Sequence, residues 1–202
     1  MSFIDQQKKL IRLTGISIVV IIVALGIIYI TSIRSSQDIP ERFVEARKNA
    51  ASVSEDIVRL TSDTNEKIAQ INVLEIKGKA EEALLLIQSA RASNEAAYGK
   101  AFDLSQNLKT LAESLADIHS PREQQIAYEA VAVELSLVSE FISYTQALNT
   151  FLSNLASLIS NNTLQNQNIV RSNISTVNEK TSLINNLNTQ FIEKMKTFDS
   201  SF

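Results

Sequence analysis

Few side chains in this chain could do chemistry, and they fit no catalytic or metal-binding template. His119 is the single histidine, and the absence of cysteine excludes disulfides, thiolate metal sites and cysteine nucleophiles together. A di-iron bundle would need two Glu-x-x-His units, and the sequence has no P-loop, GxGxxG or HExxH motif. His119 and the pair Glu81-Glu82 lie at predicted helix ends, where their charges would interact favourably with the helix dipole. We therefore expect no enzymatic activity, no catalytic residue, and no cofactor or metal.

One set of polar residues could form a site inside a helical bundle. When the predicted helices are paired through their turns, five polar residues fall at similar heights: Thr61, Thr64, Asn94, Thr145 and Asn149. Small residues at Ala90, Ala97 and Ala101 lie beside them and reduce the volume of the seam. This polar layer has two interpretations. It either fixes helix register, as a buried Asn does in coiled coils, or lines a small pocket for a ligand.

The elements that must position these side chains are long helices. The chain contains four Gly and two Pro, far below average usage of about 7% and 5%, and a sheet protein needs turn residues at short intervals. We predict helices over about 40–77, 79–118, 121–160 and 164–198. At the standard rise each is about 52 to 60 Å long. Near-equal lengths and short connections predict an all-α fold, an elongated antiparallel (up-down-up-down) four-helix bundle with coiled-coil-like packing.

Apolar residues recur at helical spacing in each predicted helix. The clearest stripe begins at Ala83 and takes alternating steps of four and three residues to Ile118, which is a heptad seam. In the third helix, one stripe gives way to another. The first contains Tyr128, Val131, Leu135, Val138 and Ile142, and the second contains Phe141, Tyr144, Leu148, Phe151, Leu155 and Leu158. We expect both stripes to face the core.

Local signals mark the ends of the helices. Gly78 offers a C-terminal stop for the first helix. The segment Ser120–Glu123 has the pattern of a capping box, with Pro121 at the first helical position. Asp63 and Glu66 resemble a second capping box, although the apolar stripe continues in phase through them. The sequence therefore leaves open whether the first helix is broken near Asp63.

Residues 13–33 form the longest uncharged apolar stretch of the chain. They read LTGISIVVIIVALGIIYITSI from Leu13 to Ile33. At about 1.5 Å per helical residue they span roughly 31 Å, close to the hydrocarbon thickness of a bilayer. The stretch is longer than the apolar region of a cleaved signal peptide, so we predict a retained single-pass transmembrane anchor.

The domain organisation and orientation follow from this anchor. Residues 1–12 form a short tail in which Lys8, Lys9 and Arg12 make translocation costly, so we expect the tail on the cytoplasmic side. Residues 34–39 are a linker, and residues 40–202 form the bundle outside the cell membrane. Because the net charge is −3, nucleic acid is not an expected partner.

We therefore predict a non-enzymatic, membrane-anchored bundle that acts as an interaction or structural module outside the cytoplasmic membrane. Its expected partners are membrane lipid and either another protein or a second copy of itself; a small-molecule ligand would use the polar layer. An anchor followed by four antiparallel helices, over about residues 13–198, resembles the sensor domains of chemoreceptors and histidine kinases. That resemblance implies ligand sensing as the alternative. The chain departs from the pattern because no second span, HAMP-like segment or output domain follows.

Overall fold

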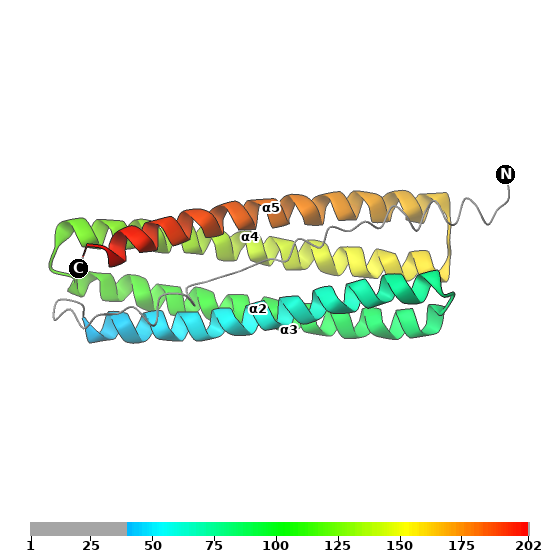
Figure 1. The fold of residues 1–202 in the computed structure, drawn as a ribbon, viewed down its shortest axis with the longest axis horizontal. Helices are drawn as coiled ribbons and strands as arrows, with labels where there is room; N and C mark the ends of the chain where they lie inside the picture. The colour runs from blue at the N-terminus through cyan, green and yellow to red at the C-terminus, as the bar shows by residue number, and fades with distance from the viewer. Residues whose placement is uncertain (1–39, 202) are drawn as a thin grey trace.

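The computed structural model describes residues 40–201, which form four long helices and no strand (Figure 1). Consecutive helices run antiparallel and pack as a bundle. Their bounds are α2 Glu41–Ile76, α3 Ala80–Ser114, α4 Pro121–Ser160 and α5 Leu164–Asp199, with a short 3-10 helix, η2 Leu115–Asp117, between α3 and α4. The predicted all-α class and four-helix bundle are confirmed.

The predicted membrane anchor lies outside the described residues, as do the tail and the linker. Within residues 40–201, the structure contains no helix that is both long and apolar enough to cross a membrane. The first described helix begins at Glu41. We call the end of the bundle that holds Glu41, the α3–α4 turn and the end of α5 the Glu41 end, and the opposite end the Gly78 end (Figure 1).

The core runs along the whole bundle and draws on every helix. Its largest fully buried side chains are Phe141, Phe198, Ile57, Ile71, Ile87, Leu104, Leu108, Leu115, Leu137, Leu152 and Ile184. The heptad stripe of α3 is buried from Ala83 to Leu111, and Leu115 and Ile118 extend it beyond the helix. Each turn of α3 therefore contributes to the core.

Alanines allow α2 and α3 to approach each other closely. Four alanines of α3 and three of α2 are buried: Ala83, Ala90, Ala97, Ala101, Ala46, Ala50 and Ala51. Because interhelical distance depends on the side chains at the contact, small residues bring the backbones together. The α2–α3 pair is accordingly the most closely packed in the described bundle, followed by α4–α5 and then α3–α4.

The stripe predicted for the first half of α4 was wrong at two residues, whereas Val131 and Val138 are buried as predicted. Tyr128 and Leu135 are exposed, whereas Ala127 and Glu134 are buried. The reason is that α4 is one continuous helix and must keep a single face toward the core. The stripe that begins at Phe141 continues backward in steps of seven to Glu134 and Ala127, so the larger apolar residues one position later point outward.

Of the two turns at the ends of α3, the one at Gly78 has the predicted backbone conformation, whereas the one at Ser120 lacks the predicted side-chain hydrogen bond. At Gly78 the backbone adopts a φ of 72°, and the N–H groups of Gly78 and Lys79 donate to the carbonyls of Glu75 and Leu74, a Schellman motif. At the other turn, the predicted capping box was wrong in its hydrogen bonds. The Ser120 side chain makes no capping bond.

The α3–α4 turn is instead held by another side chain. Gln124 Nε2 donates to the carbonyl of Leu115, at 2.9 Å, which satisfies an end carbonyl of the α3 segment. The Glu123 carboxyl that should complete the box has a buried oxygen, Oε2, without a partner among the described residues. The first helix is also unbroken, since α2 runs through Asp63 without interruption.

The left-handed conformation of Gly78 generates the first prediction. Gly78→Ala should lower the free energy of unfolding by about 1 kcal/mol, because a Cβ is unfavourable at positive φ. No atom lies within 4 Å of the added Cβ, so backbone strain is the sole cause. The matched control is Gly99→Ala, inside α3 with equally open surroundings, which should raise stability by about 0.5 to 1 kcal/mol. Urea unfolding measures both, and equal shifts in one direction would contradict the assignment.

Candidate functional site

The structure brings the predicted polar layer together at mid-length from three helices. α2 supplies Thr61 and Thr64, α3 supplies Asn94, and α4 supplies Thr145 and Asn149. The first four are buried in the core, whereas Asn149 is half-buried at its edge. These residues share a height because the turns on either side of α3 fix the pairing of antiparallel helices.

Two hydrogen bonds of this layer cross between α3 and α4. Asn94 Nδ2 donates to the backbone carbonyl of Thr145 at 2.8 Å, inside the core. Arg91 Nε donates to Asn149 Oδ1 at 2.9 Å, at the outer edge of the same helix pair. Together they fix the register of α3 against α4, because sliding either helix by one turn would break both bonds.

The threonines are satisfied within their own helices, with one exception. The hydroxyls of Thr64 and Thr145 donate to the carbonyls of Leu60 and Ile142, each at 2.8 Å. The Thr61 hydroxyl is buried and has no partner among the described residues. Of the layer's side-chain hydrogen bonds, those of Asn94 and Asn149 are the ones that cross between helices.

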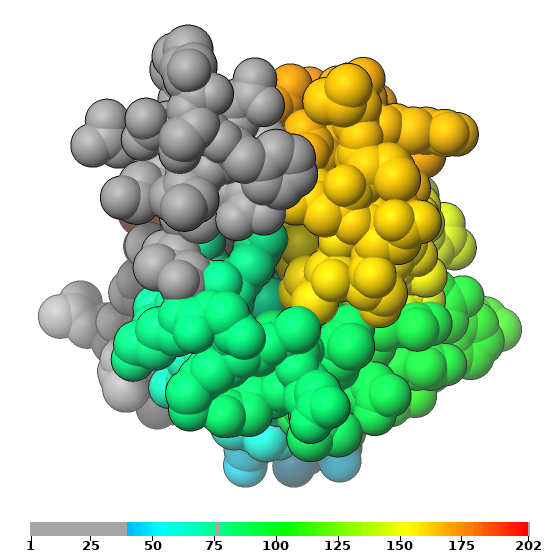
Figure 2. All heavy atoms as spheres, turned by 90° about the vertical axis from the view of Figure 1, so that its right-hand side faces the viewer, coloured from blue at the N-terminus to red at the C-terminus, as the bar shows by residue number. Residues whose placement is uncertain are grey.

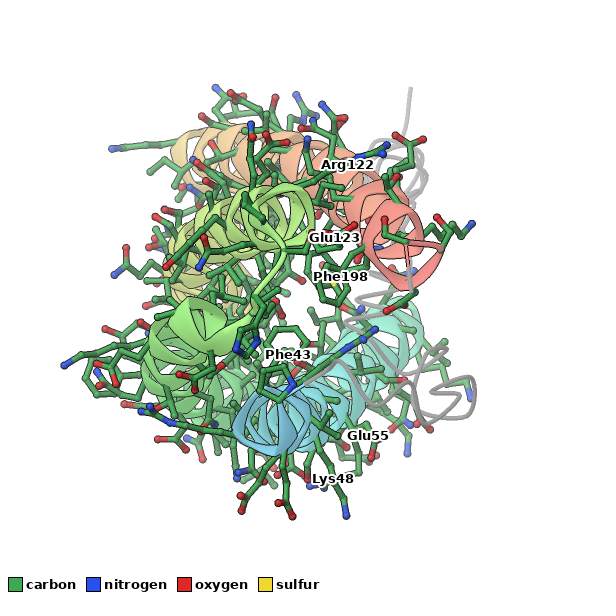
Figure 3. The ribbon with its side chains drawn as sticks, turned by 90° about the vertical axis from the view of Figure 1, so that its left-hand side faces the viewer. Phe43, Lys48, Glu55, Arg122, Glu123 and Phe198 are labelled. Carbon is green, nitrogen blue, oxygen red and sulfur yellow. The ribbon has the colours of Figure 1, made fainter. Side chains whose placement is uncertain are left out.

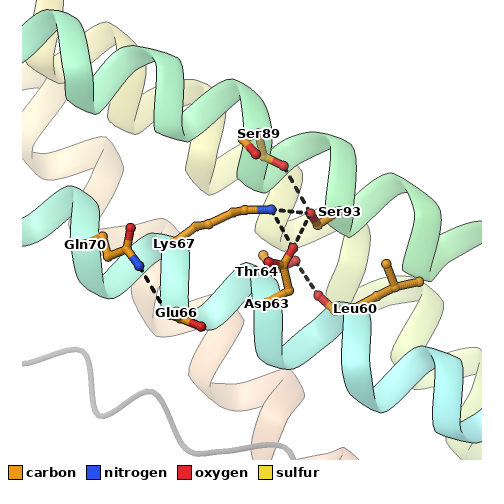
Figure 4. A network of polar contacts seen from close by, with 8 residues as sticks. All are labelled: Leu60, Asp63, Thr64, Glu66, Lys67, Gln70, Ser89 and Ser93. Atoms are coloured by element: carbon orange, nitrogen blue, oxygen red, sulfur yellow. Dashed lines mark hydrogen bonds and ion pairs between the residues drawn. The ribbon is translucent and has the colours of Figure 1, made fainter.

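A polar network on the surface ties α2 to α3 near the layer (Figure 4). The Ser93 hydroxyl donates to Asp63 and accepts a hydrogen bond from the Lys67 ammonium, which also bonds Asp63. Hydrogen bonds from Lys67 and Ser93 lower the pKa of the Asp63 carboxyl below its ordinary value. Asp63 therefore serves as a bridge between helices within an unbroken α2.

A shallow apolar groove lies between α2 and α3 toward the Gly78 end. It offers about 570 Å³ and is lined by Gln70, Val73, Leu74, Glu82, Leu85 and Leu86. Figure 2 shows this end of the molecule, where the α2–α3 turn and the α4–α5 turn lie side by side. None of the five polar-layer residues lines this groove, so the two features are separate.

A buried carboxyl, missed in the sequence reading, lies on α4 toward the Glu41 end. Glu134 is only 5% exposed, and no side-chain hydrogen bond joins it to another described residue. Burial raises the pKa of Glu134 to about 8, with the charge of Arg47 acting in the opposite direction. Its position seven residues before Phe141 is the sequence signal that could have identified it.

Arg47 also joins α2 to α5, the first and last helices of the bundle. Its guanidinium makes two hydrogen bonds, of 2.8 and 3.0 Å, to the carboxylate of Asp199, so α2 is linked to α5 by a bidentate pair. Beside it, the rings of Phe43 and Phe198 pack with centroids 5.4 Å apart. Figure 3 shows the two rings meeting inside the bundle, with Glu123 directed toward them.

The chemistry available in this arrangement is protonation and hydrogen bonding. At neutral pH the Glu134 carboxyl is largely protonated, since its pKa lies near 8. Within residues 40–201, no group of three or more His, Cys, Asp or Glu side chains is placed to hold a metal ion. Most of the ion pairs among the described residues connect one helix to another.

The chain was compared with known proteins at the level of sequence and fold. No protein-family model, curated protein or solved structure matches it.

The buried carboxyl makes stability depend on pH. The folded state holds Glu134 with a pKa near 8, above an ordinary value of 4.5, so the neutral form is favoured in the fold. The contribution of Glu134 to the free energy of unfolding is fully present below about pH 4.5 and is lost as the pH rises toward 8. We expect the free energy of unfolding to fall by a few kcal/mol between pH 5 and pH 8.5, at about 1.4 kcal/mol per pKa unit.

Glu134→Gln should largely remove this fall, because the amide stays neutral at every pH. The matched control is Glu55→Gln, an exposed carboxyl on α2, which should retain the wild-type pH dependence. Urea titrations at a series of pH values measure the effect. A Glu134→Gln protein as pH-dependent as the wild type would refute the assignment.

The polar layer generates a second prediction for the site. Asn94→Ala removes a buried interhelical hydrogen bond and leaves a small cavity, so it should cost about 1 to 3 kcal/mol. Asn149→Ala removes the half-buried counterpart and should cost less than about 1 kcal/mol. Chemical denaturation of both variants gives the comparison. An equal cost for the two would mean that the buried bond has no special part in holding α3 on α4.

Proposed function

We propose that this protein is a membrane-tethered interaction module whose helical bundle stands outside the cytoplasmic membrane and presents a docking surface. The observation that carries the proposal is a segment without charge. Residues 141–170 contain no Asp, Glu, Lys or Arg, although they include the second half of α4, the α4–α5 turn and the start of α5. Leu164 in this segment is 77% exposed.

An uncharged surface is suited to contact with another molecule. Charged groups are costly to take out of water, whereas Ser, Thr, Asn and apolar side chains lose less on desolvation. The outer face of α4 in this segment carries Gln146, Thr150 and Ser153, all exposed. The surface can therefore be buried by a partner at low cost.

The shape of the bundle supports a role in display. α2 has 36 residues and is about 54 Å long. Its first residue, Glu41, lies at the opposite end of the bundle from the α4–α5 turn (Figure 1). With residues 13–33 as the anchor, the uncharged segment would lie in the half of the bundle furthest from the bilayer.

The ionisable groups of the bundle support a non-enzymatic role. Arg47, Asp63 and Lys67 take part in contacts that join helices to one another. Lys180 of α5 likewise pairs with Glu140 of α4. Side chains used in this way hold the scaffold and are occupied by their partners.

The membrane anchor is tested by fractionation of the full chain. We expect the protein to stay in the membrane pellet after alkaline carbonate and to be released by detergent. The double variant Val23→Arg and Leu25→Arg should move to the soluble fraction, because each central Arg costs about 2.5 to 3.5 kcal/mol on insertion. The control is Ser52→Arg, at an exposed position of α2. This variant should stay in the membrane pellet, as the wild-type protein does.

Orientation is tested in the same cells. Because the chain lacks cysteine, Ser139→Cys introduces a single thiol on the exposed face of α4. A membrane-impermeant maleimide should label this thiol in intact cells. Labelling only after lysis would place the bundle inside, and recovery of the wild-type chain in the soluble fraction would overturn the proposal of an anchor.

A further inference from the structure

The outer grooves of the bundle differ in what lines them. Ion pairs cross the α2–α3 pair, as between Lys100 and Asp56 at 2.9 Å. They also cross the α4–α5 pair, as between Lys180 and Glu140 at 2.9 Å. Among the described residues, no ion pair crosses from α3 to α4. This pair instead carries exposed apolar side chains, which we call the aromatic stripe: Tyr98 (42% exposed), Phe102 (58%), Tyr128 (45%) and Leu135 (41%).

The register of α3 and α4 brings this stripe into one groove. The hydrogen bond from Arg91 to Asn149 marks a pair of positions at the outer edge of the two helices. Because residues seven apart lie on nearly the same face of a helix, equal steps along antiparallel helices give further facing positions. These steps set Tyr98 opposite Ile142, Ser105 opposite Leu135, and Ala112 opposite Tyr128. Apolar side chains therefore occupy most of these facing positions, with Ser105 as the polar exception between Tyr98 and Ala112.

Charged residues flank the stripe symmetrically along α3. Glu95 lies seven residues before Phe102, and Lys109 lies seven residues after it. Both are exposed, and neither pairs with another charged residue in the described part of the chain. Arg91 and Glu113 do not extend this pattern, because Arg91 bonds to Asn149 of α4 and Glu113 pairs with Arg42 of α2, so they lie toward opposite edges of α3. The charges thus reverse in sign about Phe102.

We propose that a second copy of this chain docks antiparallel on the α3–α4 groove, about a two-fold axis that passes near Phe102. Such an axis brings each surface against itself in reverse, so Glu95 meets Lys109 of the second copy and Lys109 meets its Glu95. The exposed ring of Phe102 lies near the axis and so meets Phe102 of the second copy. A parallel arrangement would instead set Glu95 against Glu95, and like charges oppose association.

The size of the surface sets the strength of this pairing. From Glu95 to Lys109 the surface is about 21 Å long, and two helices side by side are about 20 Å wide. The area covered is about 420 Å² per copy, about half of the roughly 800 Å² of a stable interface. We therefore expect a weak dimer that depends on local concentration.

Antiparallel pairing has a consequence that rests on the proposed function. The two copies would begin their bundles at opposite ends of the dimer, about 50 Å apart by the length of one helix. Their anchors would then enter two facing membranes, so the pairing would connect membranes. The docking surface itself needs no anchor, and its test in detergent is independent of which side of a membrane the bundle occupies.

Cysteine cross-linking of the full chain in mild detergent tests the pairing, because the native chain has no thiol. Phe102→Cys should form a disulfide-linked dimer on mild oxidation, at least tenfold more than the control Leu183→Cys, an exposed leucine on α5. Glu95→Cys and Lys109→Cys should each give little dimer alone and should cross-link when mixed. Cross-linking of Glu95→Cys with itself would overturn the antiparallel arrangement, and yields no higher than the control would overturn the docking.

Charge exchange tests the same contacts without a covalent bond. Lys109→Glu should weaken dimerisation at least fivefold in sedimentation velocity, since both symmetric contacts become repulsive. The double variant Glu95→Lys and Lys109→Glu should recover the wild-type dissociation constant within about twofold. Both positions are exposed, so circular dichroism should show an intact fold. A double variant as weak as the single variant would refute the pairing of these two charges.

Discussion

The bundle depends on the small-residue seam of α3. This helix is central because it packs on α2 through alanines and on α4 through its leucines and Asn94. Ala83, Ala90 and Ala97 recur at heptad spacing and are almost fully buried. A larger side chain at any of these positions would force the backbones of α2 and α3 apart, because a close-packed interior has no spare volume. The positions of all the other helices follow from this close approach.

Buried polar groups supplement the seam, since hydrophobic packing alone does not fix how far one long helix slides along another. A heptad stripe repeats each seven residues, and so nearly equivalent packings exist one heptad apart. The bond from Asn94 to Thr145 and the bidentate pair of Arg47 with Asp199 each exist in one register only. They lie at mid-length and at the Glu41 end. The two sites together set both the height and the closure of the bundle.

The sequence predicted those features that depend on local or periodic signals. The heptad stripe of α3, the stop at Gly78 and the helical start at Pro121 all appear in the structure, because each arises from a few neighbouring residues. Pairing the helices through their turns also brought Asn94 near Thr145. The hydrogen bond itself was beyond prediction, since Asn94 bonds to a backbone carbonyl. The contact of Arg47 with Asp199 spans 152 positions, and no local pattern indicates it.

The misplaced stripe of α4 and the exposed surface of the α3–α4 pair have one cause. In the first half of α4, hydropathy alone favours Tyr128 and Leu135 over Ala127 and Glu134, which precede them by one residue. The core takes Ala127 and Glu134 because α4 must continue in phase with Phe141. A carboxyl is thus buried while Tyr128 and Leu135 face solvent. An arrangement that buries a carboxyl and exposes an aromatic ring opposes the stability of the monomer. Exposed apolar side chains that lie close together are typical of surfaces that contact another molecule.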